Sequence, residues 1–277
     1  MQRVTFTNSR GETIELYEQP FFLNKIEGLG DVDATIHSLK APGQDGSTLI
    51  DVTLEERYIP IEVVILKDLL DNRKLISKIF NPKLGPGTLV YENDNYKREI
   101  TAVSEHVPKF ADERPRLGQK AIIDLVCPNP YWRDVNPTNI KLEDFVSNFS
   151  FPFSFPVSFA VRGDSKSFLN DGHVPTPIKV TFVGESVNPK ITNVTTGDFI
   201  KVNRTVPQGY SLIITTDFDN TAVKIVAPDG VETNAMGYID LNSEFFNLDI
   251  GDNQLMFITD GGTPEVYIEY KNWYVGV

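Results

Sequence analysis

The sequence predicts a mainly β protein of two domains with a single helix. Aromatic residues make up 11% of the 277 residues, including 18 Phe and 10 Tyr, and such residues favour strands. Short segments that alternate apolar with polar residues recur between turn signals over most of the chain. A proline-rich segment, Cys127–Asp134, ends an apolar run near the middle of the chain. A chain of this length is long enough for two domains, so we expect the domain change there.

The first half reads as strands around one helix, an arrangement typical of a small barrel or an α+β domain. Strands are predicted at residues 2–7, 13–17, 58–65, 88–91, 96–103 and 120–126. Residues 41–48 form a polar, Gly-rich loop. The helix is predicted over residues 67–80, and Asn81–Pro82 stops it. Its apolar face would consist of Leu69, Leu70, Ile76, Ile79 and Phe80.

The central segment marks the predicted domain boundary. Proline cannot donate to a strand ladder, so Pro128 and Pro130 end the preceding strand. We expect one domain over residues 1–135 and a second over residues 136–277. Cys127 is the single cysteine, so no intrachain disulfide can form. At the end of an apolar strand it is expected to be a buried, small apolar residue.

The second half reads as strands alone. Candidates lie at residues 177–183, 189–194, 199–202, 211–215, 223–226, 253–258 and 265–270. Gly-containing turn signals separate them at regular spacing, which is typical of a β-sandwich.

A phenylalanine-rich segment, residues 149–159, precedes these strands. Its apolar side chains all fall on odd positions, so in an extended chain they point to one side. Pro152 and Pro156 exclude a central strand. We interpret this segment as a packed interdomain linker, with an interface to another chain as the alternative.

Charge and hydropathy exclude several classes of function. The net charge is −12, from 26 basic and 38 acidic side chains, whereas nucleic-acid binders carry a basic surplus or stripe. We therefore expect no direct nucleic-acid binding. No apolar run approaches the length of a membrane span, and residues 1–8 lack a signal-peptide core, so no membrane insertion is expected.

The residues that carry chemistry do not form recognisable sites. His37, His106 and His173 are far apart in sequence, which argues against zinc. Asp217 begins a segment that resembles a calcium loop, but Thr221 replaces the third ligand, so we predict a polar turn. Phosphate-binding and nucleophile-elbow motifs are missing, while a glycosidase carboxylate pair stays open. We predict no catalytic, metal-binding or cofactor-binding residues, and no enzyme activity.

Three segments, in this order and spacing, resemble siphophage distal tail proteins, the hub proteins of long flexible phage tails. They are Asn81–Tyr91, Cys127–Trp132, and Phe168–Ile178 leading to Gly184 and Asn188–Asn193. The resemblance implies an N-terminal split-barrel-like domain and a C-terminal galectin-like β-sandwich. It also implies a hexameric ring that joins the tail tube protein to a tail-associated fibre or lysin protein. The location would be the virion tail tip of a phage or prophage, after synthesis in the bacterial host cytoplasm.

A second hypothesis is a carbohydrate-binding module or host-adhesion protein, because a galectin-like sandwich could bind sugar. A lectin site usually stacks an exposed aromatic ring on the sugar. Trp132 and Trp273 are the two tryptophans, and both positions suggest core residues.

Charge also suggests which half self-assembles. Residues 1–135 carry 17 basic and 21 acidic side chains, a net charge of −4, and residues 136–277 carry 9 and 17, a net charge of −8. Ring closure brings identical surfaces together, which like charge opposes. We therefore assign self-assembly to residues 1–135. The Gly43–Thr48 loop is our candidate for an element that reaches a neighbour, with an ordinary exposed loop as the alternative.

Overall fold

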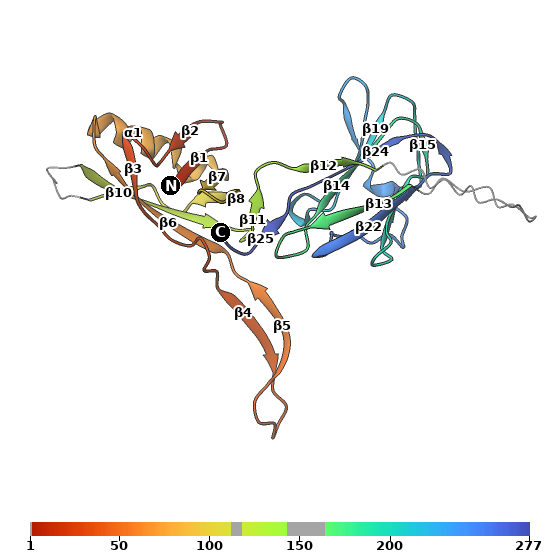
Figure 1. Cartoon of the computed structure of the whole chain (residues 1–277), viewed down its shortest axis with the longest axis horizontal. Helices are drawn as coiled ribbons and strands as arrows, with labels where there is room; N and C mark the ends of the chain where they lie inside the picture. The colour runs from red at the N-terminus through yellow and green to blue at the C-terminus, as the bar shows by residue number, and fades with distance from the viewer. Residues whose placement is uncertain (1, 112–117, 143–163) are drawn as a thin grey trace, which may run out of the picture. The chain divides into compact units, whose positions relative to one another are not determined.

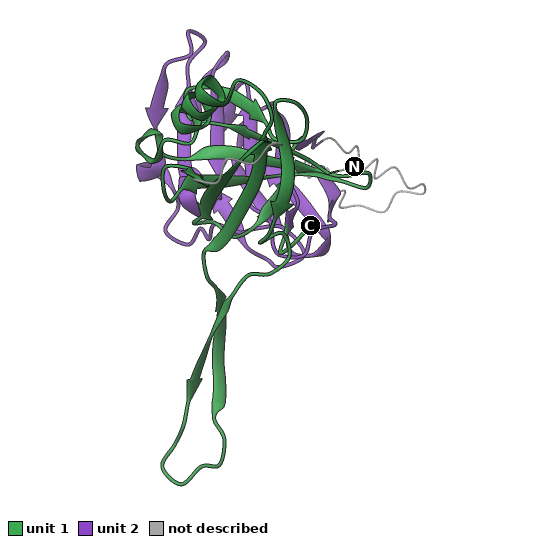
Figure 2. Cartoon of the chain, turned by 90° about the vertical axis from the view of Figure 1, so that its left-hand side faces the viewer, with its two compact units in different colours: residues 1–135, 274–277 green, residues 136–273 purple. Residues whose placement is uncertain are grey.

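The computed structural model describes residues 2–111, 118–142 and 164–277. The phenylalanine-rich segment at residues 149–159 lies outside these residues. The chain divides into two compact units (Figure 2). Unit 1 contains residues 1–135 and 274–277, and unit 2 contains residues 136–273. The chain therefore leaves unit 1, builds unit 2, and returns to unit 1.

The predicted mainly β fold is confirmed, and the described residues of unit 1 contain one α-helix (Figure 1). The elements of unit 1 are β1 (Arg3–Thr7), β2 (Thr13–Glu15), β3 (Phe21–Ile26), β4 (Ala34–Leu39), β5 (Thr48–Leu54), β6 (Arg57–Ile65), α1 (Leu69–Ile79), the 3₁₀ turn η1 (Pro82–Leu84), β7 (Gly87–Glu92), β8 (Lys97–Ser104), β9 (Lys109–Phe110), β10 (Gln119–Cys127), β11 (Trp132–Asp134) and β25 (Trp273–Tyr274).

The main sheet of unit 1 is antiparallel, and its strand order is β2-β1-β7-β8-β10-β6-β3. β6 and β10 pair along their whole lengths, from Arg57 opposite Cys127 to Ile65 opposite Gln119. Alternate residues of both strands are buried, as strand periodicity requires. Among the described residues the sheet ends at β2 and β3 without closing into a barrel.

α1 packs its C-terminal end on this sheet. Ile76, Ile79 and Phe80 are buried, and the Phe80 ring stacks on Phe6 with 4.6 Å between centroids. The helix ends before Asn81, whose side chain accepts a hydrogen bond from the backbone N–H of Lys83. Leu69 and Leu70 were expected on the buried face, but they are exposed, because only the last turn of the helix contacts the core.

Unit 2 contains only strands and two 3₁₀ turns among its described residues. They are β12 (Thr138–Lys141), β13 (Asp164–Asn170), β14 (Ile178–Val183), β15 (Ser186–Val187), β16 (Lys190–Asn193), β17 (Phe199–Lys201), β18 (Thr205–Val206), β19 (Ser211–Thr215), η2 (Phe218–Asn220), β20 (Ala222–Val226), β21 (Glu232–Asn234), η3 (Met236–Tyr238), β22 (Gly251–Ile258), β23 (Gly261–Gly262) and β24 (Glu265–Tyr270).

Two main sheets share the core of unit 2. One runs β12-β24-β14-β19-β20-β21 and the other β13-β22-β16-β17, while β18-β15-β23 form a small third sheet. Phe182 of the first main sheet meets Phe257 of the second edge-on, with 6.1 Å between ring centroids, and Phe168 meets Tyr270 in the same manner at 6.4 Å. Face-to-face packing of two antiparallel sheets is a β-sandwich.

Candidate functional site

The most unusual surface of the protein is a hairpin made by β4 and β5, which we call the arm (residues 34–54). It extends away from the rest of unit 1 and forms a two-stranded sheet of its own (Figures 1 and 2). The register places Ile36 opposite Val52 and Leu39 opposite Thr48, with a shift after His37. A two-stranded hairpin is marginally stable in water by itself, so contact with a further surface would stabilise the arm.

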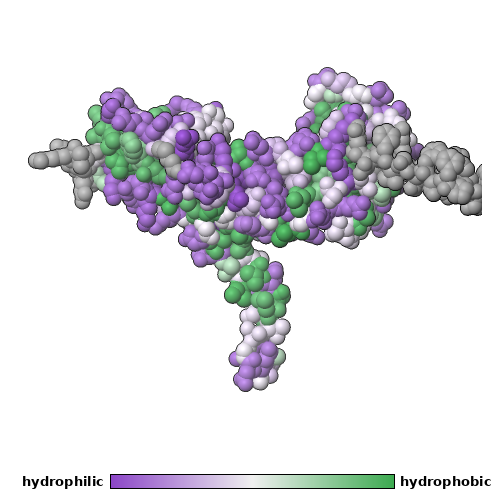
Figure 3. Space-filling model, in the orientation of Figure 1, coloured by the Kyte–Doolittle hydropathy of each residue, from purple (hydrophilic) through white to green (hydrophobic). Residues whose placement is uncertain are grey.

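The arm exposes apolar side chains along its length. Five aliphatic residues are between 48% and 67% exposed, namely Ile36, Leu39, Leu49, Ile50 and Val52. Figure 3 shows this hydrophobic surface on the part of the arm nearer to unit 1, which we call the shaft, and hydrophilic residues at the tip of the arm. A contiguous exposed apolar surface is typical of a protein–protein contact. Covering these side chains would be worth roughly 5–7 kcal/mol, at about 2 kcal/mol for each fully buried aliphatic side chain.

The Gly43–Thr48 loop lies at the tip of the arm. Gly43 and Gly46 both have a φ of +77°, and the Gln44 side chain accepts a hydrogen bond from the backbone N–H of Ala41. The sequence pattern indicated the position of this loop but not its two flanking strands, because every residue of β4 and nearly every residue of β5 is exposed. Without a buried face, the strands lack the regular alternation that would predict them.

A second exposed apolar surface of unit 1, which we call the helix-start patch, consists of Phe22, Leu66, Leu69 and Leu70. Phe22 on β3 lies beside Val64 on β6, and the backbone N–H of Leu66 donates to the carbonyl of Pro20. Figure 3 shows hydrophobic surface at the end of unit 1 that carries α1 and β3. The arm and the patch therefore offer two apolar surfaces on different parts of one unit.

The residues that could have carried chemistry are separated or buried. His37 lies on the arm, where its Nε2 is 3.2 Å from Thr53 Oγ1, and His106 Nδ1 is 3.7 Å from Glu105 Oε2. No cluster of three His, Cys, Asp or Glu side chains among the described residues could hold a metal ion. Asp217 caps η2, a polar turn as predicted, and its side chain accepts a hydrogen bond from the backbone N–H of Asp219. Among the described residues, none of the helices has the length and hydropathy of a membrane-spanning helix.

Cys127 is fully buried at the end of β10, as expected for an apolar residue. Burial raises the pKa of its thiol to about 12, with Arg57 opposing the shift. The nucleophile of cysteine chemistry is the thiolate, so this side chain is inert at neutral pH.

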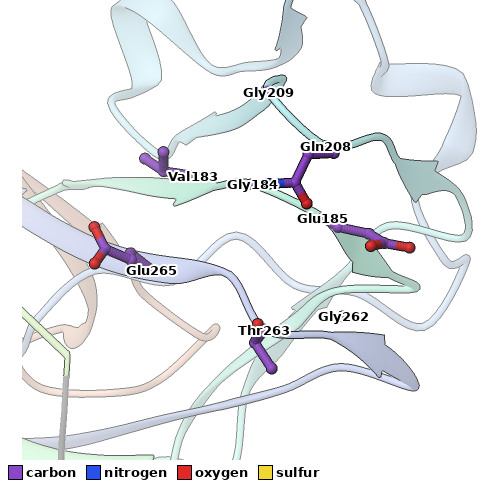
Figure 4. A pocket seen from close by; sticks show the side chains of 8 residues that line it. All are labelled: Val183, Gly184, Glu185, Gln208, Gly209, Gly262, Thr263 and Glu265. Carbon is purple, nitrogen blue, oxygen red and sulfur yellow. The ribbon is translucent and has the colours of Figure 1, made fainter.

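The two tryptophans and the cleft of unit 2 do not together form a sugar-binding site. Trp132 is completely buried and Trp273 is 7% exposed, so both belong to cores as the sequence suggested. A cleft of about 470 Å³ in unit 2 is lined by Val183, Gly184, Glu185, Gln208, Gly209, Gly262, Thr263 and Glu265 (Figure 4). No aromatic ring lines it. The Glu185 and Glu265 side chains point in opposite directions, and Glu265 is already paired with Lys141 at 2.8 Å.

Two family models match the chain. The model of the phage tail protein RIFT-related domain matches residues 9–155, which is more than half of the chain, and the model of the siphovirus-type tail component, C-terminal domain, matches residues 171–274. No curated protein sequence matches significantly.

Solved structures of phage tail proteins have the same fold. The crystal structure of SPP1 Dit, described as a paradigm of the hub adsorption apparatus in phages that infect Gram-positive bacteria, aligns with a TM-score of 0.68 at 12% identity over 98% of both chains. Chains of the phage P2 baseplate in its activated conformation align over 100% of both chains, with a TM-score of 0.61 at 11% identity for the calcium form and 0.62 at 10% for the strontium form. The shared fold thus includes both units.

Proposed function

Because the chain belongs to the siphophage distal tail protein family, we propose that it is a structural hub of a phage tail tip that assembles with copies of itself. The observation that carries this proposal is the apolar arm of unit 1, within a fold shared with hub and baseplate proteins. Unit 2 would be the galectin-like domain of the hub. The role is non-catalytic, and it requires no metal or cofactor.

We propose that the arm of one copy covers the helix-start patch of the next. Such a contact joins two different surfaces, so its repetition generates a closed ring when the rotation permits. The family resemblance supplies the number of subunits, which is six. Both surfaces lie in unit 1, which supports the assignment of self-assembly to the less acidic part of the chain.

The ring would join the tail tube protein on one side to a tail-associated fibre or lysin protein on the other. In this role the protein would act at the virion tail tip, after synthesis in the cytoplasm of the bacterial host. The family resemblance is the support for these partners.

The mass of the intact protein in solution tests the proposal. We expect a particle of about six 31.1-kDa chains by mass photometry, and ring-shaped particles by electron microscopy. A protein that stays a 31.1-kDa monomer at high micromolar concentration, and that binds cell-wall oligosaccharides on a glycan array, would instead support the carbohydrate-binding alternative.

A further inference from the structure

The root of the arm, by which we mean residues 27–33 and 55–58 on its two sides, contains a fully buried arginine, Arg57, whose side chain bonds to three other backbone segments. Its guanidinium donates hydrogen bonds to the carbonyl oxygens of Gly28 (2.8 Å), Asp31 (3.3 Å), Pro130 (2.8 Å) and Val275. Gly28 and Asp31 precede β4, and Arg57 follows β5, so this one side chain connects the two ends of the arm. A buried guanidinium that donates four hydrogen bonds to backbone carbonyls forms a rigid junction.

The segment that contains Val275 follows unit 2 in the sequence. Residues 274–277, which we call the strap, re-enter unit 1 after unit 2. Tyr274 belongs to β25, which pairs with β11, and its ring lies against the Arg98 guanidinium at 3.2 Å from the ring centroid. Arg98 also donates to the carbonyl of Gly276 at 3.0 Å. The strap is therefore anchored to the body of unit 1.

The strap also contacts the segment of the root that precedes β4. The backbone N–H of Val277 donates to the carbonyl of Leu29 at 3.1 Å. Gly276 lies so close to Gly30 that a Cβ atom on Gly276 would be 3.1 Å from the Cα of Gly30. With Val275 bound to Arg57, consecutive strap residues contact the root at three points.

The arm is connected to β3 on one side and to β6 on the other, and these two strands pair with each other in the main sheet. Two further backbone hydrogen bonds join the two sides of the root beyond that pairing. The backbone N–H of Glu55 donates to the carbonyl of Asp33 at 2.9 Å, and that of Glu27 donates to Pro60 at 3.2 Å. The shaft itself is exposed on both faces. The orientation of the arm is therefore decided by its root.

We propose that the strap is a positioning element that holds the arm at a fixed angle to unit 1. The chain delivers this element only after passing through unit 2, so the binding geometry of the arm depends on an intact connection through unit 2. The consequence for assembly rests on the proposed function, whereas the holding of the root does not and can be measured in the monomer.

Hydrogen–deuterium exchange of the full-length protein tests this proposal. The principal variant is Gly276→Val, whose side chain displaces the strap from Gly30 and leaves Tyr274 in place. Gly237→Val in unit 2 is the matched control, because a Cβ there meets no atom within 4 Å. A chain shortened after Trp273 removes the strap altogether. The readouts are peptides covering residues 27–33 and 54–56, compared with residues 119–127 of β10.

We expect the root peptides of Gly276→Val to exchange about tenfold faster, the effect of losing one or two hydrogen bonds, with β10 and the Gly237→Val control unchanged. Wild-type exchange at the root in both strap variants would overturn the proposal. So would equal acceleration of the root and β10 in Gly276→Val, because the strap would then be an ordinary core element. Faster exchange at the root together with normal self-assembly would support the proposal that the strap positions the arm. The same result would refute the role of the arm in assembly.

Discussion

Replacing two isoleucines of the arm should weaken self-assembly without unfolding the protein. Ile36 lies on β4 and Ile50 on β5, and their exposed fractions are 67% and 66%. The double variant Ile36→Thr/Ile50→Thr keeps a β-branched side chain at both positions, so the propensity of the hairpin to form is preserved. Only the apolar surface offered to a neighbour changes.

The expected size of the effect follows from exposure. Fully burying an isoleucine is worth about 1.5–3 kcal/mol, most of which threonine cannot supply. Because two thirds of each side chain is available to a partner, each substitution should cost about 1–2 kcal/mol per interface. The pair together costs about 2–4 kcal/mol, which lowers the association constant of each interface roughly 30-fold to 700-fold.

Mass photometry and sedimentation velocity over a dilution series would measure the midpoint concentration of assembly. The midpoint of the double variant should rise by at least about 30-fold, since each ring contact contains one arm. Thermal unfolding should stay close to that of the wild type, because exposed substitutions usually change stability by about 0.5 kcal/mol or less.

Leu241→Thr is the matched control. Leu241 is the most exposed large aliphatic side chain of the described residues, and it lies in unit 2. Its replacement removes hydrophobic surface without touching the arm, so it should assemble as the wild type does. If the double variant and Leu241→Thr share the wild-type midpoint, the arm does not carry the contact and the reasoning from exposed apolar surface fails.

Two further predictions concern the cores. Cys127 should resist thiol reagents until the protein unfolds. Its pKa of about 12 in the folded protein lies above the unfolded value, so as the pH rises the thiol loses its proton first in the unfolded state, and the free energy of unfolding should fall by up to about 1.4 kcal/mol per pH unit from about pH 9 to pH 12. Denaturation curves of Cys127→Ala at the same pH values should lack this slope. Phe182→Ala should destabilise unit 2 by about 3–5 kcal/mol, because Phe182 is fully buried against Phe257, whereas Phe218→Ala, at 77% exposure, should shift the urea midpoint little; equal shifts would contradict the packing argument.

The sequence predicted the elements whose side chains alternate between core and solvent. β6 and β10 follow the predicted segments at residues 58–65 and 120–126 because one face of each is buried. The β7–β8 hairpin was likewise predicted, since Asn93 supplies the turn by accepting from the N–H groups of Asn95 and Tyr96. Periodicity is informative where a core selects one face.

The arm lacks the periodicity that a buried face produces. β4 and β5 have no buried face, so their residues lack the alternation of apolar and polar side chains that would predict strands. The exposure of Leu69 and Leu70 depends on how α1 ends on the sheet, which helical periodicity does not encode. The return of residues 274–277 to unit 1 is a long-range contact without any local signature.

That return also sets an order of events during synthesis. Unit 1 is the first unit to leave the ribosome, but the last pieces of its structure, β25 and the residues after it, are translated only after all of unit 2. At synthesis rates of roughly 5–20 residues per second, the nascent chain waits on the order of ten seconds between finishing β11 and receiving the residues that complete the unit. During this interval the apolar hairpin is already present on an unfinished domain. Neighbouring nascent chains on one messenger RNA would therefore meet before the hairpin root of either chain is fixed, and productive pairing would be postponed until residues 274–277 have been made.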